Sequence, residues 1–140
     1  MYNSTVLTAI GRIIAVAGLA TVLIAGCSRI PKMVGTYRGF RSYQVAPGED
    51  PVVVQQAARV EIIVKGDKVY LSDGGLPAEG RIDYGDSSAT FVPESFMGQS
   101  ADQQNPALVK QFTVPLKPLP GGDWLYGGSV RLEKQPATTP

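Results

Sequence analysis

Alternating side chains on both sides of a single turn constrain this fold more than any other feature of the sequence. Residues 60–72 read VEIIVKGDKVYLS, in which Gly66-Asp67 has the composition of a two-residue hairpin loop. With that turn, the residues that face each other across the strands are Val64 and Val69, and Ile62 and Leu71. Turn and period select the same register, so these side chains share one apolar face. A helix would scatter them around its axis.

A second hairpin is predicted over residues 81–92, where the loop at residues 85–88 reads GDSS. The cross-strand pairs that this loop sets are Tyr84 with Ala89 and Ile82 with Phe91. Both pairs again fall on one apolar face, as the core side of an antiparallel hairpin requires.

Three further segments predict strands. Residues 33–40 form the first, and in residues 111–116 Phe112, Val114 and Leu116 alternate with polar positions, while Pro115 indicates an edge or bulged strand. The last strand is expected to run from residue 123 to residue 134, bending at Gly127-Gly128. The apolar side chains that keep one phase along it are Trp124, Tyr126, Val130 and Leu132.

Residues 46–58 support two interpretations. Asp50-Pro51 is a good start for a short helix, whereas Val52-Val53-Val54 is a run of β-branched side chains that favours extended chain. We expect the extended form.

The chain of 140 residues has room for one core, and its 16 Gly and 11 Pro describe many turns between short strands. The predicted fold is all-β, a small antiparallel meander barrel or sandwich of about six or seven strands, after a cleaved N-terminal signal helix. The globular domain is expected at residues 33–134. The tail at residues 135–140 has nothing to bury and is expected to be disordered.

The absence of histidine excludes several function classes. Without it the chain lacks the usual general base at neutral pH and the commonest metal ligand, so familiar triads and zinc sites are excluded or handicapped. The closest carboxylate pairs are Asp83 with Asp86 and Glu49 with Asp50. Asp86 is better explained as a turn residue than as a general acid or base. We therefore expect no enzyme activity, no catalytic residue and no metal.

The N-terminus has the layout of a secretory signal. Residues 1–12 contain one arginine and no acid, and residues 13–26 are uncharged and apolar except for Thr21. At about 1.5 Å per residue, about 14 residues reach roughly 21 Å, which is short of a bilayer core of about 30 Å. A cleaved signal is therefore favoured over a spanning helix.

The tetrapeptide Ile24-Ala25-Gly26-Cys27 ends this segment and resembles the lipobox of bacterial lipoproteins. The resemblance implies cleavage before Cys27, a diacylglyceryl group on its thiol and often an acyl chain on the new amino group. It also implies a signal peptide at residues 1–26 and a lipidated tether at residues 27–32, with no cofactor besides this covalent lipid. Ser28 is compatible with transfer to an outer membrane where the organism has one, and otherwise the cell membrane is expected. The rival interpretation is an uncleaved signal-anchor with an incidental cysteine.

Charge narrows the choice of partners. Removal of Arg12 with the signal leaves 12 of the 13 basic side chains against 12 acidic ones, so no field that attracts nucleic acid is expected. The basic residues that precede the first acid, Glu49, are Arg29, Lys32, Arg38 and Arg41. Close to an anchored cysteine, they either rest against lipid phosphates or form a solvated strand end.

A shorter resemblance involves Gly35-Thr36-Tyr37 in the first predicted strand and Arg131 in the last. These residues look like the lipocalin-type arrangement, in which a G-x-W motif is covered by a basic side chain from the final strand, with Tyr37 here in place of tryptophan. The resemblance favours a meander barrel over a Greek-key sandwich.

Binding is the remaining class of function. Residues 93–106 are expected to be irregular and long enough to be functional, and they contain Phe96-Met97. The candidate partner or ligand contacts are Phe40, Tyr43, Phe96 and Met97, which would otherwise pack on the domain's own core.

We therefore expect a membrane-anchored envelope lipoprotein whose β-domain binds a nearby envelope protein or an apolar ligand. The alternative is a purely structural or assembly lipoprotein with no small-molecule ligand, and an enzyme is the least favoured interpretation. A filled interior with Phe96 and Met97 exposed would favour a protein partner. An enclosed cavity would favour a ligand, and its expected lining residues are Tyr37, Ile62, Leu71 and Trp124.

Overall fold

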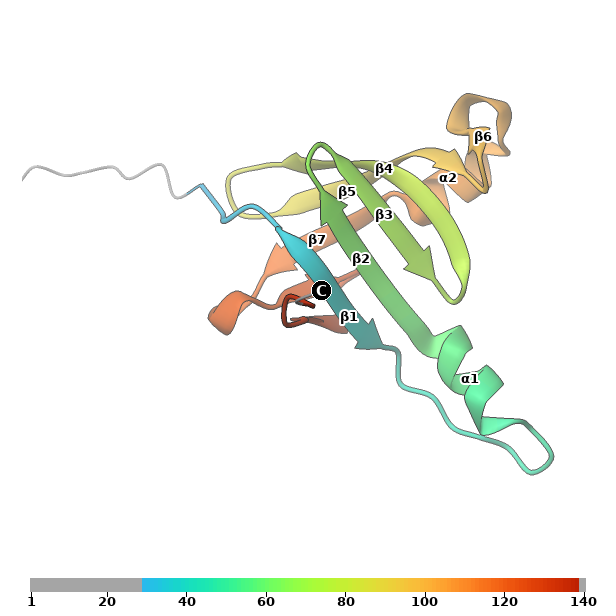
Figure 1. Cartoon of the computed structure of the whole chain (residues 1–140). Coiled ribbons are helices and arrows are strands. Elements are labelled where there is room, and N and C mark those ends of the chain that lie inside the picture. Colours follow the sequence, from blue (N-terminus) through green and yellow to red (C-terminus); the bar gives the residue numbers. More distant parts are fainter. Residues whose placement is uncertain (1–28, 139–140) are drawn as a thin grey trace, which may run out of the picture.

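Eight antiparallel strands close into a barrel in the computed structural model, which describes residues 29–138 (Figure 1). The elements in chain order are β1 (Gly35–Phe40), α1 (Pro51–Ala58), β2 (Arg59–Lys65), β3 (Lys68–Asp73), β4 (Leu76–Tyr84), β5 (Ala89–Phe96), β6 (Gln99–Ser100), the 3-10 turn η1 (Ala101–Gln103), α2 (Pro106–Phe112), β7 (Val114–Pro118), the 3-10 turn η2 (Pro120–Gly122), β8 (Trp124–Tyr126) and β9 (Val130–Lys134). The predicted signal peptide and Cys27 lie outside the described residues.

The ring follows the order of the chain, which makes it a meander. Strands β1 to β5 pair in succession, β7 continues from β5, and β9 closes the ring by pairing with β1 at Tyr37 and Arg38. Strand β6 pairs with β5 outside the ring. The N–H of Gln135 donates to the carbonyl of Thr36 and extends the closing seam by one residue. The all-β meander barrel is thereby confirmed, with a few more strands than the expected six or seven.

Both predicted hairpins have the expected register. In the first, Val64 pairs with Val69 and Ile62 with Leu71. In the second, the pairs are Tyr84 with Ala89 and Ile82 with Phe91. Local turn chemistry and the two-residue period were sufficient here, because both act within a few residues of the turn.

The prediction of extended chain at residues 46–58 is wrong, because residues 51–58 form α1. The Asp50 side chain accepts a hydrogen bond of 2.9 Å from the N–H of Val52, and Pro51 occupies the first turn. This cap outweighs the strand preference of the valines. Val52 and Val53 are 59% and 61% exposed, so no sheet face rewards them for being extended.

The prediction of one long final strand is also wrong. The chain turns back at residues 127–129, where Gly127 and Gly128 have φ of 59° and 78°, and β8 pairs with β9. A three-residue turn preserves the phase of the apolar positions. Trp124 therefore faces Leu132, Tyr126 faces Val130, and all four are buried, as the alternation predicted.

Strand β7 is shorter than predicted and lies inside the ring rather than at an edge. Residues 106–112 form α2, which the Asn105 side chain caps by accepting 2.9 Å from the N–H of Ala107. Pro115 is tolerated because β8 ends at Tyr126, and only the N–H of Gly127 reaches back to the Pro115 carbonyl. The missing N–H of the proline therefore has no strand residue to bond.

Residues 93–106 are more regular than expected. Strand β5 continues to Phe96, a tight turn at Met97-Gly98 leads into β6, and η1 follows. The turn places Met97 at a φ of 46°. Phe96 is buried whereas Met97 is 76% exposed, so the two neighbours face opposite environments.

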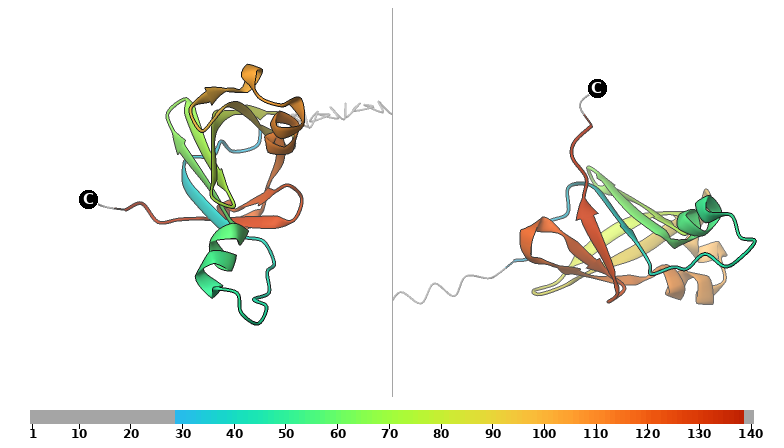
Figure 2. Two further views of the ribbon diagram at one scale, coloured as in Figure 1. Left: turned by 90° about the vertical axis from the view of Figure 1, so that its right-hand side faces the viewer. Right: turned by 90° about the horizontal axis from the view of Figure 1, so that it is seen from below.

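The barrel has two ends that differ in what they carry (Figures 1 and 2). We call the end where the chain enters β1 the tether end; it also carries the β2–β3, β4–β5 and β7–β8 connections. We call the opposite end the far end; it carries α1, β6, α2 and the β3–β4 and β8–β9 turns. Apolar side chains fill the space between them. The buried ones in this cluster are Met33, Tyr37, Val60, Ile62, Val69, Leu71, Ala78, Ala89, Phe91, Phe96, Phe112, Val114, Leu116, Trp124, Tyr126, Val130 and Leu132.

Candidate functional site

A polar cluster of Asp73, Tyr126 and Arg41 spans the far end of the barrel. The Tyr126 hydroxyl donates to Asp73 Oδ2 at 2.7 Å, and the two guanidinium nitrogens of Arg41 donate to the two oxygens of the same carboxylate. Strands β3 and β8 lie opposite each other in the ring, with three strands between them on either side. The cluster therefore joins opposite walls and closes this mouth.

The electrostatics of this cluster describe a fixed ion pair rather than a catalytic acid or base. Burial alone would raise the pKa of Asp73, but hydrogen bonds from Arg41 and Tyr126 outweigh it, so the pKa lies below its usual value. Burial and the Asp73 carboxylate raise the pKa of Tyr126 far above its usual value. Asp73 stays ionised and Tyr126 stays protonated at neutral pH, and neither titrates where acid–base catalysis needs it.

The tether end is closed by the start of the chain itself. Met33 is 2% exposed, and its N–H donates to the Tyr84 hydroxyl at 2.9 Å. The next N–H, of Val34, donates to the Tyr37 hydroxyl at 3.3 Å. Residues 33 and 34 are thus fastened to the barrel by two backbone donors.

Side chains pack together in the barrel interior, at the place where an enclosed ligand cavity was one of the expectations. The four side chains named as its lining, Tyr37, Ile62, Leu71 and Trp124, are between 0% and 3% exposed and belong to one core cluster. Among the described residues, every buried side-chain nitrogen or oxygen has a hydrogen-bond partner. With the interior filled, a ligand or partner would have to bind on the outer surface.

Exposed apolar side chains gather at the far end. The large hydrophobic residues that are 42% to 76% exposed there are Phe40, Tyr43, Val45, Val52, Val53, Leu76 and Met97. Phe40, at the end of β1, and Val52, on α1, line one hollow of about 210 Å³. The segment from Arg41 to Ala58 projects from the barrel, and it presents most of this set (Figures 1 and 2). We call these seven residues the far-end apolar set.

The four predicted contact residues divide three to one. Phe40 and Tyr43 are 42% and 43% exposed, and Met97 is the most exposed of the large hydrophobic residues. Phe96 instead packs inside, edge to face against Phe112 with ring centroids 5.0 Å apart. Phe96 therefore contributes to the core, while the other three are free to meet a partner.

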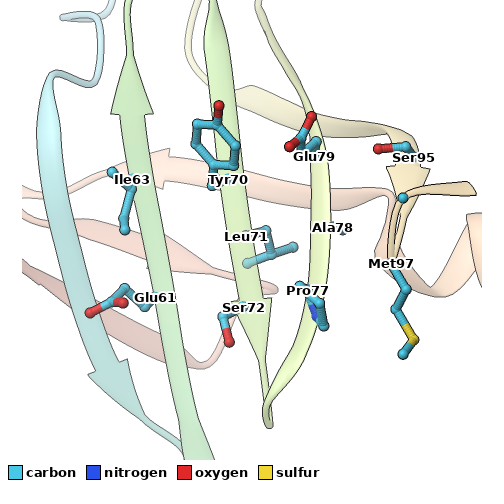
Figure 3. Close-up of a pocket in the computed structure, with 11 residues that line it drawn as sticks. Glu61, Ile63, Tyr70, Leu71, Ser72, Pro77, Ala78, Glu79, Ser95 and Met97 are labelled. Atoms are coloured by element: carbon cyan, nitrogen blue, oxygen red, sulfur yellow. The ribbon is translucent and has the colours of Figure 1, made fainter.

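A groove runs over the outer face of β2, β3 and β4 beside Met97 (Figure 3). It measures about 250 Å³, and Ile63, Tyr70 and Pro77 are among the residues that line it. Glu61 lies at one side, held by Arg38 and Arg59 at 2.7 Å each. Burial would raise the pKa of Glu61, but these two hydrogen-bonded arginines outweigh it and lower the pKa. The groove thus offers apolar walls beside a carboxylate that is ionised at neutral pH.

The carboxylates considered for catalysis all lie exposed on the surface. Asp83 pairs with Arg81 at 3.0 Å, and Arg81 also contacts Glu94 at 3.2 Å, while Asp86 is in the exposed β4–β5 loop. Asp50 caps α1. Within residues 29–138, no group of three His, Cys, Asp or Glu side chains is placed to hold a metal ion.

The two residues of the lipocalin-type resemblance face opposite sides of the sheet: Tyr37 faces the interior and Arg131 faces outward. Tyr37 points into the core and is 3% exposed. The Arg131 side chain is on the outer face, 59% exposed, and donates to Asp123 at 2.6 Å. In the closing strand β9, the side chains that pack into the core are those of Val130 and Leu132.

The fold and surface define a small closed antiparallel barrel with a filled interior and an apolar far end. Comparisons with protein-family models, with curated proteins and with solved structures found no match to this chain. None of the helices that the structure describes is both long enough and apolar enough to cross a membrane.

Sequence reasoning missed the cluster of Arg41, Asp73 and Tyr126. These residues lie 32 and 53 positions apart along the chain, and no local pattern links them. The sequence placed Arg41 and Arg38 among the basic residues that precede the first acid, Glu49. The structure shows both in ion pairs, which removes them from that group.

Proposed function

We propose that this protein is a lipid-anchored lipoprotein of the bacterial cell envelope, and that its barrel binds a neighbouring envelope protein through the far end. The anchor is supported by the lipobox resemblance at Cys27. The observation that carries the choice of partner is the exposed far-end apolar set beside a filled interior. Exposed aromatic and methionine side chains at one end of the barrel are a composition that suits protein interfaces.

The geometry of the tether supports contact at the far end. Five residues lie between Cys27 and the buried Met33, and the six residue steps that join them reach at most about 22 Å when extended. A barrel anchored there rests close to the bilayer with its tether end foremost. The far end then points away from the lipid, toward other proteins of the envelope.

A protein partner is favoured over an apolar small molecule by the same observations. The core side chains of the barrel interior pack against one another, and the groove beside Met97 lies on the outer face of the sheet, where it is only partly enclosed (Figure 3). Small apolar ligands bind where most of their surface is enclosed. A side chain from another protein fits an open groove better, because the rest of the partner covers it.

Site-specific photocrosslinking in living cells tests this proposal. A photoreactive residue at Tyr43 or Val53, in the full-length chain, is expected to form an adduct with a different envelope protein. Lys117 on β7 is the matched exposed control near the tether end and should form none. Adducts only between two copies of this chain would favour the purely structural or assembly role. No adduct at either far-end position would contradict far-end binding.

A further inference from the structure

The charges of this neutral domain are separated between its two ends. Five of the twelve basic side chains that the structure describes are in ion pairs, namely Arg38, Arg41, Arg59, Arg81 and Arg131. Those without an acidic partner in residues 29–138 are Arg29, Lys32, Lys65, Lys68, Lys110, Lys117 and Lys134. All seven are exposed, so their charge acts on whatever lies next to the barrel.

Six of these seven lie toward the tether end. Arg29 and Lys32 belong to the entering chain, and Lys65 and Lys68 flank the β2–β3 turn, because Gly35 pairs with Val64. Lys134 lies opposite Tyr37 at the end of β9, and Lys117 lies near the end of β7. Lys110, on α2, is alone at the far end. Strands that are distant in sequence thus bring the cations together.

The acidic side chains without an ion pair are distributed the other way. Three of them, Asp67, Asp86 and Glu133, lie toward the tether end. The four on the other half are Glu49, Asp50, Glu79 and Asp102. Among the side chains outside ion pairs, the tether end thus has an excess of three positive charges and the far half an equal negative excess.

One exposed apolar side chain accompanies the cations. Val34 is 63% exposed and, unlike the far-end apolar set, it lies where the chain enters the barrel. It borders a hollow of about 400 Å³ whose lining includes Lys32, Arg81 and Tyr84. Basic side chains around an apolar contact are typical of surfaces that rest in the interface of a bilayer.

We propose that the tether end is a docking surface for anionic phospholipid headgroups. Arg29, Lys32, Lys65, Lys68, Lys117 and Lys134 provide the charge, and Val34 provides the apolar contact. The proposal rests on the lipid anchor of the proposed function, which keeps this end within reach of phosphates. Each Lys or Arg at an anionic surface strengthens such binding by about fivefold. Docking would hold the barrel in the orientation that the short tether favours, with the far end outward.

Purified lipidated protein in vesicles tests the orientation, because a lipidated Cys27 leaves an introduced cysteine as the sole free thiol. Ser87→Cys, in the exposed β4–β5 loop, reports on the tether end, and Val53→Cys reports on the far end. Each carries a fluorophore whose access to a water-soluble quencher is measured. In vesicles containing phosphatidylglycerol, the probe at position 87 should be protected relative to phosphatidylcholine vesicles, and salt should remove the protection. The probe at position 53 should stay accessible in both.

Charge variants decide whether the cations are responsible. Replacing three lysines, Lys32→Gln, Lys68→Gln and Lys134→Gln, should weaken docking by about a hundredfold and abolish protection at position 87. Lys110→Gln is the matched control and should leave protection unchanged. Equal quencher access at position 87 in both lipids, with the protein retained on the vesicles, would overturn the docking surface.

Flotation of the same vesicles separates this proposal from the anchor. An anchored protein floats with both lipid compositions, whatever its orientation. A protein that floats only with phosphatidylglycerol would support the docking surface and contradict the anchor. A protein that floats with neither would contradict both.

Discussion

At the scale of single residues, the far mouth of the barrel depends on one carboxylate with three donated hydrogen bonds. Arg41, just after β1, supplies two of them, and Tyr126 supplies the third from β8, which lies opposite the strand of Asp73 in the ring. The Arg41 guanidinium also lies 5.9 Å from the centroid of the Tyr126 ring. Asp73 is therefore the residue whose loss leaves the most polar groups without a partner.

Asp73→Asn is expected to lower the free energy of unfolding by about 1–3 kcal/mol at pH 7. The loss should fall in the lower part of this range, because the Arg41 side chain is 41% exposed and solvent screens the pair. Denaturant titration followed by tryptophan fluorescence measures it, since Trp124 is buried and close to β9. Asp83→Asn, at an exposed surface pair, is the control and should leave the midpoint nearly unchanged.

The same pair predicts a dependence on pH with a definite sign. The pKa of Asp73 is lower in the folded protein than in the unfolded chain, so its contribution is fully present above about pH 4 and is lost as the pH falls through the folded value. The difference in free energy of unfolding between the wild type and Asp73→Asn should therefore shrink as the pH is lowered from about 5 to about 2, because the Asp73 carboxylate becomes protonated. A difference that stayed constant over that range would show that the carboxylate charge contributes nothing.

At the scale of elements, two glycines let the strands approach closely enough for the ring to close. A Cβ built on Gly39 in β1 would lie 2.1 Å from the carbonyl oxygen of Arg131 in β9. One built on Gly80, beside the irregular register of β4 and β5, would lie 2.1 Å from the carbonyl oxygen of Val92. Both contacts are to backbone, which cannot move aside as a side chain can.

Gly39→Ala is therefore expected to lower the free energy of unfolding by about 1–3 kcal/mol, because the closing seam between β1 and β9 must open to admit the methyl group. Thermal unfolding followed by circular dichroism measures the change. Thr36→Ala, at an outward position of the same strand, is the control and should have a much smaller effect. A Gly39→Ala protein as stable as the wild type would show that the seam is looser than described.

The elements also show which parts of the fold can be predicted from sequence. The two hairpins were predictable because the turn and the alternation act within about ten residues of each other. α1 was not, because the single side chain of Asp50 decides between helix and strand against the preference of three valines. The hairpin at Gly127-Gly128 was not, because a bend and a three-residue turn leave Tyr126 and Val130 in the same phase.

The candidate site was predictable only where exposure could be inferred from local context. Phe40, Tyr43 and Met97 lie on the far-end surface, but Phe96 is in the core, since its neighbour Met97 takes the turn. The basic tether end was only half visible in the sequence. Lys68 is placed at the tether end by the β2–β3 hairpin, whereas Lys134 comes there through the pairing of β9 with β1, which no linear pattern contains.

At the scale of the whole molecule, the far end and the core are independent enough to be tested separately. Tyr43→Ser and Val53→Ser remove exposed side chains, so the free energy of unfolding of each variant should stay within about 0.5 kcal/mol of the wild-type value. Recovery of the photocrosslinked partner, with the probe at Val52, should fall in both variants. Unchanged recovery would show that the partner contacts another surface. Asp86→Ser, in the exposed β4–β5 loop, is the matched control.

The proposed lipid anchor on Cys27 determines where the whole molecule is held, and Cys27→Ser tests it. Only a thiol can form the thioether of a lipidated cysteine, so serine should leave residues 1–26 uncleaved or release the barrel from the membrane fraction. Mass spectrometry of the wild-type protein should show a chain that begins at Cys27 and carries two or three acyl chains, because one chain holds a protein only marginally. Arg29→Gln, two residues further on, is the control and should be processed normally. A wild-type protein that retains residues 1–26 with an unmodified thiol would contradict the anchor, and with it the reason for the tether end to face lipid.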